Sequence, residues 1–237
     1  MDTPHPTPPQ HQPSATERQR EALKSHIVKL ATKAFYAHGV KNVTMDDIAH
    51  TLTMSKRTLY QLFQDKEELL LACVISHQTE MRKQLEELYN GEEHPNVLNI
   101  MLSTFEMRMA HMKDVEPTFY QDIAKYPKVI AFLEKSARDD ESEAMAFIEM
   151  GVEQGYFRRD LNFRIIYNQF SSQLAAISKN PILQQFSMSE IFINTVVVYL
   201  RGGATIKGVE LIDQFLDRVH ADRSVGKKHT MLSRCMQ

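Results

Sequence analysis

The sequence has few of the residues that build turns and cross-links. Its 237 residues include 8 Gly, 9 Pro and 2 Cys, and five of the prolines fall before residue 14. A many-stranded sandwich or barrel needs a turn about every 8–12 residues, so this scarcity excludes such folds. Two cysteines are too few for a disulfide framework. Cys73 lies in an apolar stretch, which favours a buried side chain over a reactive thiol.

Long apolar runs and targeting signals are also missing. The longest apolar run, near residues 191–200, is well short of the ~20 residues of a membrane-spanning helix and contains Asn194 and Thr195. The first sixteen residues are polar and proline-rich, unlike the basic and then apolar pattern of a signal peptide. We therefore expect a soluble, cytoplasmic protein with no membrane partner, and a disordered arm over residues 1–16.

Signatures of catalysis and metal binding do not occur in the sequence. No Glu has a His three residues later, and none of the ten His residues pairs with another at i+3 or i+4. The chain also has no Gly-rich phosphate loop and no nucleophile elbow. Single histidines such as His77 and His111 are interpreted as solvated or satisfied. We expect no enzyme activity, no catalytic residue, no metal site and no cofactor.

Helical periodicity dominates the sequence from Glu17 onward. Leu23, Ile27 and Leu30 recur at helical spacing and predict a helix over residues 18–38, which Gly39 ends. Capping residues then predict short helices over residues 45–52 and 56–63. The cap of the first is Thr44 with Asp47, and the cap of the second is Ser55. Asp65 and Glu68 form the capping box of a long helix that reaches about Tyr89.

The rest of the chain also has the pattern of successive helices. We expect helices at residues 96–113 and 162–177, and a short helix that starts at Pro117. Another starts at Pro127 and has clear helical period from residue 132 to 151 or 155. The last runs from a capping box at 187–190 to about Ile206. The β-branched run at 196–200 has strand propensity, but the upstream capping box favours helix. The predicted fold class is all-α.

The three short N-terminal helices have the spacing of a helix-turn-helix unit, because the second and third are separated by a turn of about three residues. Polar donors on the third helix point away from its Leu59 and Phe63 side and are placed to reach phosphates or base edges. Any short amphipathic helix has an outward polar face, so the spacing of all three helices is what favours DNA. The candidate DNA-binding residues are Thr44, Ser55, Lys56, Arg57, Thr58, Tyr60, Gln61 and Lys66.

The segment TMDDIAHTLTMSKRTLYQLFQDKEELL, residues 44–70, resembles the N-terminal DNA-binding domain of TetR-type transcriptional regulators. The upstream KLATKAFYAHGV fits the same pattern, and the resemblance covers about residues 18–72. One departure occurs in the turn, where the family has Ala-Gly-Val and this chain has Leu52-Thr53-Met54. Without the glycine, Thr53 must adopt the backbone conformation of the turn at some strain.

The resemblance implies a homodimer that binds a palindromic operator, acts as a repressor and is released by a small hydrophobic ligand in its C-terminal core. The apolar faces of the last two predicted helices are wider than a single core requires, which favours a four-helix dimer interface. An entirely intrachain role for these faces remains the alternative. The candidate dimer residues are Ile166, Phe170, Leu174, Ile193, Val197 and Leu200.

Methionine and aromatic residues gather in residues 101–150, which hold six of the 13 Met. Such side chains accommodate varied apolar ligands, although at helical spacing they also build ordinary cores. The candidate ligand-binding residues are Phe105, Met109, Met112, Phe119, Tyr120, Tyr167 and Phe170. Alternatively, the chain is a DNA-binding regulator that has no small-molecule inducer and responds to a protein partner.

Charge is distributed unevenly although the total is only -2. Residues 17–66 hold nine Lys and Arg against five Asp and Glu, a net charge of +4, whereas residues 67–222 hold 15 against 24, a net charge of -9. The predicted domains follow this division: an arm at 1–16, a helix-turn-helix domain at 17–66, a helical regulatory and dimerisation domain at 67–220, and a basic tail at 221–237. The acidic body would repel DNA and orient the basic unit towards it.

Overall fold

The computed structural model describes residues 14–91, 96–113, 115–177, 180, 186 and 188–219. Most of the expected N-terminal arm, the basic tail with Cys235, and Ser187 of the capping box at 187–190 lie outside this part of the chain. In the described part the architecture is helical, as the sequence predicts. None of its helices is both long and apolar enough to cross a membrane.

The N-terminal unit consists of α1 (Ala15–His38), α2 (Met45–Thr51) and α3 (Lys56–Leu62). All three predicted helices are confirmed, but α1 begins at Ala15 rather than at residue 18. Ser14 caps the helix in a reciprocal box: its Oγ accepts from the Glu17 N–H at 3.2 Å, and its own N–H donates to Glu17 at 2.6 Å. The capping signal therefore extends into the segment that the proline content assigned to the arm.

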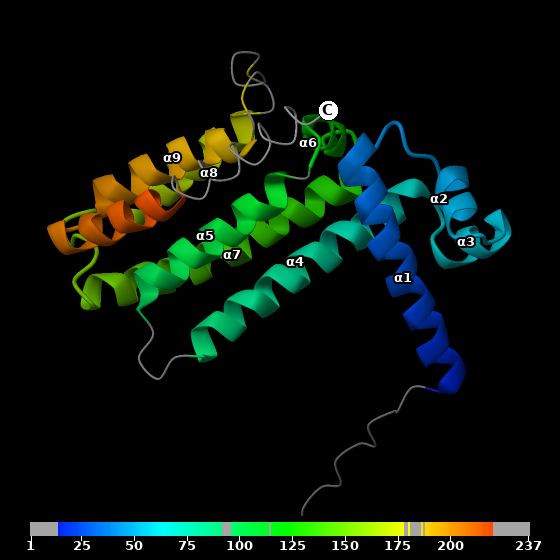
Figure 1. Ribbon diagram of the computed structural model, residues 1–237, viewed down its shortest axis with the longest axis horizontal. Helices are drawn as coiled ribbons and strands as arrows, with labels where there is room; N and C mark the ends of the chain where they lie inside the picture. The colour runs from blue at the N-terminus through cyan, green and yellow to red at the C-terminus, as the bar shows by residue number, and fades with distance from the viewer. Residues whose placement is uncertain are drawn as a thin grey trace, which may run out of the picture.

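The longer helices build the C-terminal body, in which α4, α5 and α7 lie side by side (Figure 1). These elements are α4 (Lys66–Asn90), α5 (Val97–Lys113), α6 (Pro117–Ile123), α7 (Pro127–Glu153), α8 (Phe163–Ile177) and α9 (Met188–Gly203). The helical prediction for the β-branched run at 196–200 is confirmed, because these residues lie within α9.

The last predicted helix is wrong at its C-terminal end. It ends at Gly203 rather than about Ile206, and a further helix covers residues 206–219. Between them the chain leaves helical geometry, where the Arg158 N–H donates to the Gly203 carbonyl and the Thr205 N–H to the Tyr156 carbonyl, both at 2.9 Å. This non-local pairing is invisible in local periodicity and sets the break.

Two apolar cores stabilise the chain. The first combines the N-terminal unit with α4 and reaches the body through Phe119 and Val129; within it Ile27, Phe35 and Leu59 have no exposed surface. The second joins α5, α9 and residues 206–219 around Leu98, Ile212 and Phe215. Because the first core spans both predicted domains, the N-terminal unit packs directly on the part of the body that contains α6.

Candidate nucleic-acid interface and internal cavity

Helix α2 begins with the predicted capping box. The Thr44 Oγ1 accepts from the Asp47 N–H at 3.1 Å, and the Thr44 N–H donates to the Asp47 carboxylate at 2.8 Å. The Thr44 hydroxyl also donates to that carboxylate at 2.6 Å, and these bonds keep the pKa of Asp47 below its ordinary value. Thr44 is at the surface, but its polar groups are engaged in fixing the start of α2.

The turn between α2 and α3 has the strained backbone that its sequence implies. Thr53 has φ 52°, the left-handed region that a β-branched residue adopts at a cost. The N–H of Met54 donates to the Ala49 carbonyl at 3.0 Å, and Ser55 Oγ then accepts from the Thr58 N–H at 3.1 Å to cap α3. The expected departure at Thr53 and the expected Ser55 cap are both confirmed.

Helix α3 presents a polar face to solvent from a rigid base. Leu59 is fully buried beneath it and Tyr60 is 48% exposed on the outer side. Lys56 is paired with Asp46 on α2 at 2.5 Å, and this hydrogen bond raises the pKa of Lys56. Arg57 is exposed and has no ion-pair partner within the described residues. Gln61 is exposed too, although its carbonyl accepts a 3.5 Å bond from Arg20.

Lys66, the remaining predicted DNA contact, has a position different from the residues of α3. Its side chain is partly buried at the start of α4, and its ammonium donates to the Lys41 carbonyl at 3.5 Å. Burial lowers the pKa of Lys66, and the nearby Asp122 and Asp47 carboxylates oppose this effect. Lys66 therefore connects α4 to the loop before α2 as well as adding positive charge there.

Asp122 of α6 forms the principal polar connection between the body and the N-terminal unit, and sequence reasoning missed it. The side chain is 6% exposed, and its carboxylate accepts from the Lys41 N–H and the Lys125 ammonium, both at 2.7 Å. Close by, the Glu116 N–H donates to the Tyr36 carbonyl at 2.8 Å. A single Asp in a short helix gives no sequence signal of this role.

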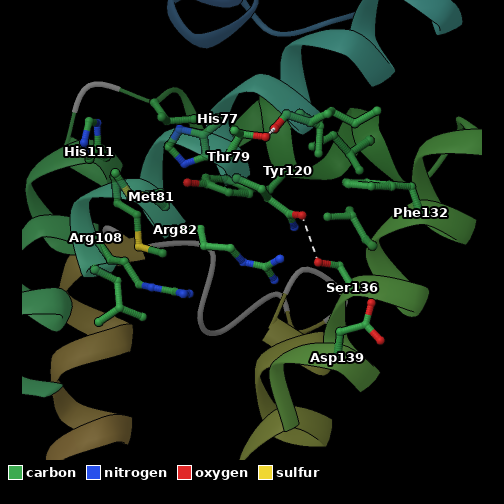
Figure 2. A pocket seen from close by; sticks show the side chains of 18 of the residues that line it. His77, Thr79, Met81, Arg82, Arg108, His111, Tyr120, Phe132, Ser136 and Asp139 are labelled. Atoms are coloured by element: carbon green, nitrogen blue, oxygen red, sulfur yellow. Dashed lines mark hydrogen bonds between the residues drawn. The ribbon is translucent and has the colours of Figure 1, made fainter. Parts of the chain in front are cut away.

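The structure contains a cavity of about 670 Å³ that α4, α5, α6 and α7 surround (Figure 2). Its size is in the range of small-molecule sites. Of the predicted ligand residues, Met112, Phe119 and Tyr120 line this cavity. Phe105 and Met109 instead belong to the second apolar core, where Phe105 lies 5.8 Å from Phe215.

Tyr167 and Phe170, the other predicted ligand residues, are on α8 and are not among the residues that line the cavity. Phe170 packs edge-on against Tyr199 of α9 at 5.6 Å. All the predicted ligand residues lie between Phe105 and Phe170, so the prediction missed the wall that Tyr36 of α1 and several residues of α4 contribute. These side chains enter the cavity only because α1 and α4 pack against α6 and α7.

The cavity has an aromatic wall on the side of the N-terminal unit. The ring of Tyr36 lies 4.8 Å from that of Phe119, and Phe119 lies 5.6 Å from Tyr120, both edge-on. Burial raises the pKa of Tyr120 to about 12, so its hydroxyl stays protonated. The Tyr36 hydroxyl stays protonated for the same reason, because burial raises its pKa further.

Two histidines and two arginines also line the cavity, and the histidine pair borders the aromatic wall, because the ring of His77 lies 6.1 Å edge-on from that of Tyr36. His77 and His111 face each other edge-on at 5.5 Å, although the sequence places them 34 residues apart. Arg82 of α4 and Arg108 of α5 both extend into the space (Figure 2). Burial lowers the pKa of His77, and the positive charges of His111 and Arg108 lower it further. Within the described chain, no group of three or more His, Cys, Asp or Glu side chains could hold a metal ion.

The predicted dimer residues divide between the core and a half-exposed surface. Ile193 is 6% exposed and belongs to the second core, whereas Ile166, Phe170, Val197 and Leu200 are half-buried. The side chain of Leu174 lies outside the described part of the structure. Apolar side chains that are more exposed than these occur on the same helices: Ile165 is 60% exposed and Val198 is 68% exposed.

Comparison with known proteins places these features in a family context. Residues 27–73 match the family of bacterial regulatory proteins named tetR. A regulator of the helix-turn-helix type from Bacillus subtilis, YhgD, is 28% identical over 136 residues, which cover 56% of this chain and 70% of that protein. The helix-turn-helix transcriptional repressor KstR2 of Mycobacterium tuberculosis is 23% identical over 155 residues, which cover 63% of this chain and 76% of the repressor.

Solved structures show the same fold over most of the chain. A TetR-family transcriptional regulator from Agrobacterium tumefaciens superimposes with a TM-score of 0.61 at 15% identity, covering 78% of this chain and 100% of that one. The similarity extends well beyond the helix-turn-helix unit, so the helical body as well as the N-terminal unit has the architecture seen in that regulator.

Proposed function

We propose, from the premise that this chain belongs to the TetR family of DNA-binding transcriptional regulators, that it is a homodimeric repressor of a palindromic operator and that a small ligand releases it. The observation that carries the proposal is the exposed polar face of α3, with Arg57 and Tyr60 above a fully buried Leu59. Such a helix fits the DNA major groove and presents donors to base edges. Repression is the activity named for the relative KstR2.

The proposed residue roles follow from how each side chain is engaged. Arg57, which is exposed and has no ion-pair partner in the described chain, is placed to read a base edge. Lys56, Tyr60, Gln61, Ser55 and Thr58 complete the α3 surface. Thr44 and Lys66 flank it at helix N-termini, where phosphate contact is favourable. These roles place DNA binding in residues 17–66 and regulation in residues 67–220.

Dimerisation through α8 and α9 would give the two reading helices a fixed separation. Ile165 and Val198 are exposed, and half-buried Ile166, Val197 and Leu200 lie on the same helices. A two-fold interface between these faces would bury them and place two copies of α3 about one DNA turn apart. A Val198→Glu variant should therefore sediment as a monomer and lose operator affinity, whereas Glu190→Gln on the exposed side of α9 should remain dimeric.

Ligand release is supported by the position of the cavity next to the N-terminal unit. Helix α6 supplies Phe119 and Tyr120 to the cavity wall, and its Asp122 binds the Lys41 N–H in the loop before α2. A ligand that displaces α6 would move this loop and change the position of α3. The alternative is a regulator that has no small-molecule inducer and answers to a protein partner. Such a regulator would be expected to have a closed, fully packed core, so the cavity favours ligand release.

Selection of bound DNA from a random pool is the direct test of the DNA-binding proposal. A palindromic consensus is expected. Arg57→Ala should lose about 1–3 kcal/mol of binding free energy at one base position, so that the sequence preference at that position is relaxed. Lys66→Ala should instead weaken binding to all sequences alike and reduce the salt slope by about one. Arg164→Ala, on α8, is the matched control and should leave DNA affinity unchanged. Unaltered affinity and preference in the Arg57 variant would contradict the base-reading role.

A further inference from the structure

The two ends of the cavity differ in chemistry. Tyr36, Phe119 and Tyr120 form the aromatic wall next to the N-terminal unit. Arg82 and Arg108 extend into the cavity from α4 and α5 and face that wall (Figure 2). A molecule that fills the cavity must therefore be largely apolar at one end and meet guanidinium groups at the other.

The charges around these two arginines are not balanced. Arg82 has a partner in Glu143, with its guanidinium 3.5 Å from the carboxylate. Arg108 lines the cavity from an exposed position and has no ion-pair partner within the described residues. Burial is the main cause of the lowered pKa of His77, and the proximity of His111 and Arg108 adds to it. The described lining holds the cations Arg82, Arg108 and Lys135 against the carboxylates Glu143 and Asp139, so positive charge is in excess.

A cationic ligand would suit the aromatic wall, but the carboxylates are poorly placed for it. Glu143 is already paired with Arg82. Asp139 lines the cavity on the side away from Arg108, as Figure 2 shows, and is exposed to solvent. Of the two carboxylates that line the cavity, one is therefore paired and the other lies away from Arg108, whereas the guanidinium of Arg108 has no ion-pair partner in the described chain.

We infer that the effector of this cavity is an amphipathic anion, an apolar molecule that carries one carboxylate, with the carboxylate bound by Arg108 and the apolar body against Phe119 and Tyr120. A guanidinium binds a carboxylate through two parallel hydrogen bonds, and the bond is stronger where water is partly excluded. The inference rests on the proposed function, since it names the ligand of the site that the proposal makes regulatory.

Three probes of equal chain length test the ligand class: octanoate, octanol and octyltrimethylammonium, titrated into the full chain by calorimetry at pH 7.5, where the carboxylate is ionised. Octanoate should bind about tenfold or more tightly than octanol, and octyltrimethylammonium should bind most weakly. Arg108→Gln should reduce octanoate affinity about 10- to 100-fold and bring it to that of octanol, with octanol affinity unchanged.

Lys83→Gln is the matched control. It removes one positive charge from α4 next to Arg82, but Lys83 pairs with Glu87 outside the cavity lining. Its octanoate affinity should equal that of the unaltered protein. Arg82→Gln should have a smaller effect than Arg108→Gln because Glu143 already neutralises Arg82.

Several results would overturn the inference. Equal affinities for octanoate and octanol, tighter binding of octyltrimethylammonium, or no binding of any probe by the folded protein would each do so. Anisotropy of labelled operator DNA in the same samples separates this inference from the proposed function. Selective octanoate binding without DNA release would leave the ligand class standing and remove ligand control. Absence of sequence-selective DNA binding would remove the regulator proposal whatever the probes do.

Discussion

The helix-turn-helix unit and the cavity region contrast in how their helices are stabilised. In the unit, α2 and α3 have seven residues each, yet Thr44 and Ser55 cap them and Leu59 is fully buried below. Around the cavity, α4 and α7 have 25 and 27 residues and leave a space of about 670 Å³ between them. Short helices need local caps and a closed core, whereas long helices remain stable around a gap.

The difference indicates that the helices around the cavity tolerate unfilled space, whereas the core below α3 does not. A reading helix must present its side chains in a fixed geometry, and a core without exposed surface supplies that rigidity. A ligand site requires space that the protein itself does not fill, which costs packing energy along the lining. Asp122 lies between the two regions, and its carboxylate connects α6 to the loop that precedes α2 through the Lys41 N–H.

Truncation of a core leucine should separate the two regions most clearly. Leu59→Ala removes a fully buried side chain, so the free energy of unfolding should fall by about 3 kcal/mol. Leu133→Ala acts on a half-buried residue that lines the cavity, where the loss should be about 1 kcal/mol because the side chain already borders a gap. Urea denaturation monitored by circular dichroism measures both values. Equal losses of unfolding free energy would show that the cavity region is as tightly packed as the N-terminal unit.

Asp122→Asn tests the connection between the regions. The variant weakens the charge-assisted bonds to the Lys41 N–H and the Lys125 ammonium, and unfolding should require about 1.5–3 kcal/mol less. Glu116→Gln, at the start of α6, is a suitable control because its side chain forms no cap and only its backbone N–H contacts Tyr36. An unchanged denaturation midpoint in the Asp122 variant would show that α6 is held by apolar packing alone.

The same variant has a defined pH dependence. Burial by itself raises the pKa of Asp122, but the hydrogen bonds from Lys125 and Lys41 outweigh it and hold the pKa below its ordinary value. A carboxyl with a lowered folded-state pKa contributes stability above its unfolded pKa of about 3.9, and that contribution is lost as the pH falls through the folded value. The stability difference between the unaltered protein and Asp122→Asn should therefore be constant near neutral pH and shrink below about pH 4.

Thr53→Gly should change the free energy of unfolding least among these variants, and it is the only one expected to raise it. Thr53 has φ 52°, and glycine adopts this conformation without a steric penalty, although it adds entropy to the unfolded chain. We expect a net stabilisation of up to about 1 kcal/mol. Thr51→Gly, at the last residue of α2, should not stabilise the protein, because the backbone of Thr51 has no positive φ for glycine to relieve and glycine adds entropy to the unfolded chain. A loss of stability in Thr53→Gly would indicate that the threonine side chain contributes to the turn.

Local signals in the sequence predicted the helices and the exposed polar face of α3. The Thr44–Asp47 capping box, the end of α1 at Gly39 and the strained Thr53 follow from side-chain chemistry within a few residues, and each is present in the structure. The predicted box at the start of α4 is only half formed: Asp65 caps the Glu68 N–H, but the Glu68 carboxylate accepts from the Gln64 N–H and not from that of Asp65. Segments without such a signal were less accurately predicted. The helix over residues 206–219 was missed because its separation from α9 depends on hydrogen bonds to residues 156–158.

Composition located the residues that line the cavity only in part. Met and aromatic residues are alike in a packed core and in a cavity wall, so sequence periodicity could not separate Phe105, which is in the core, from Phe119, which lines the cavity. The charged side of the cavity gave no signal at all, since His77 and His111 are on different helices. Their 5.5 Å separation exists only after α4 and α5 have packed.

The sequence by itself determined an all-helical chain, the helix-turn-helix unit and its basic charge, because caps, periodicity and charge are local properties. Only the tertiary structure decided where the cavity lies, which residues line it and that Asp122 of α6 is bonded to the N-terminal unit. Those features depend on contacts between residues that are far apart along the chain, such as Lys41 with Asp122, and no local pattern encodes such a contact.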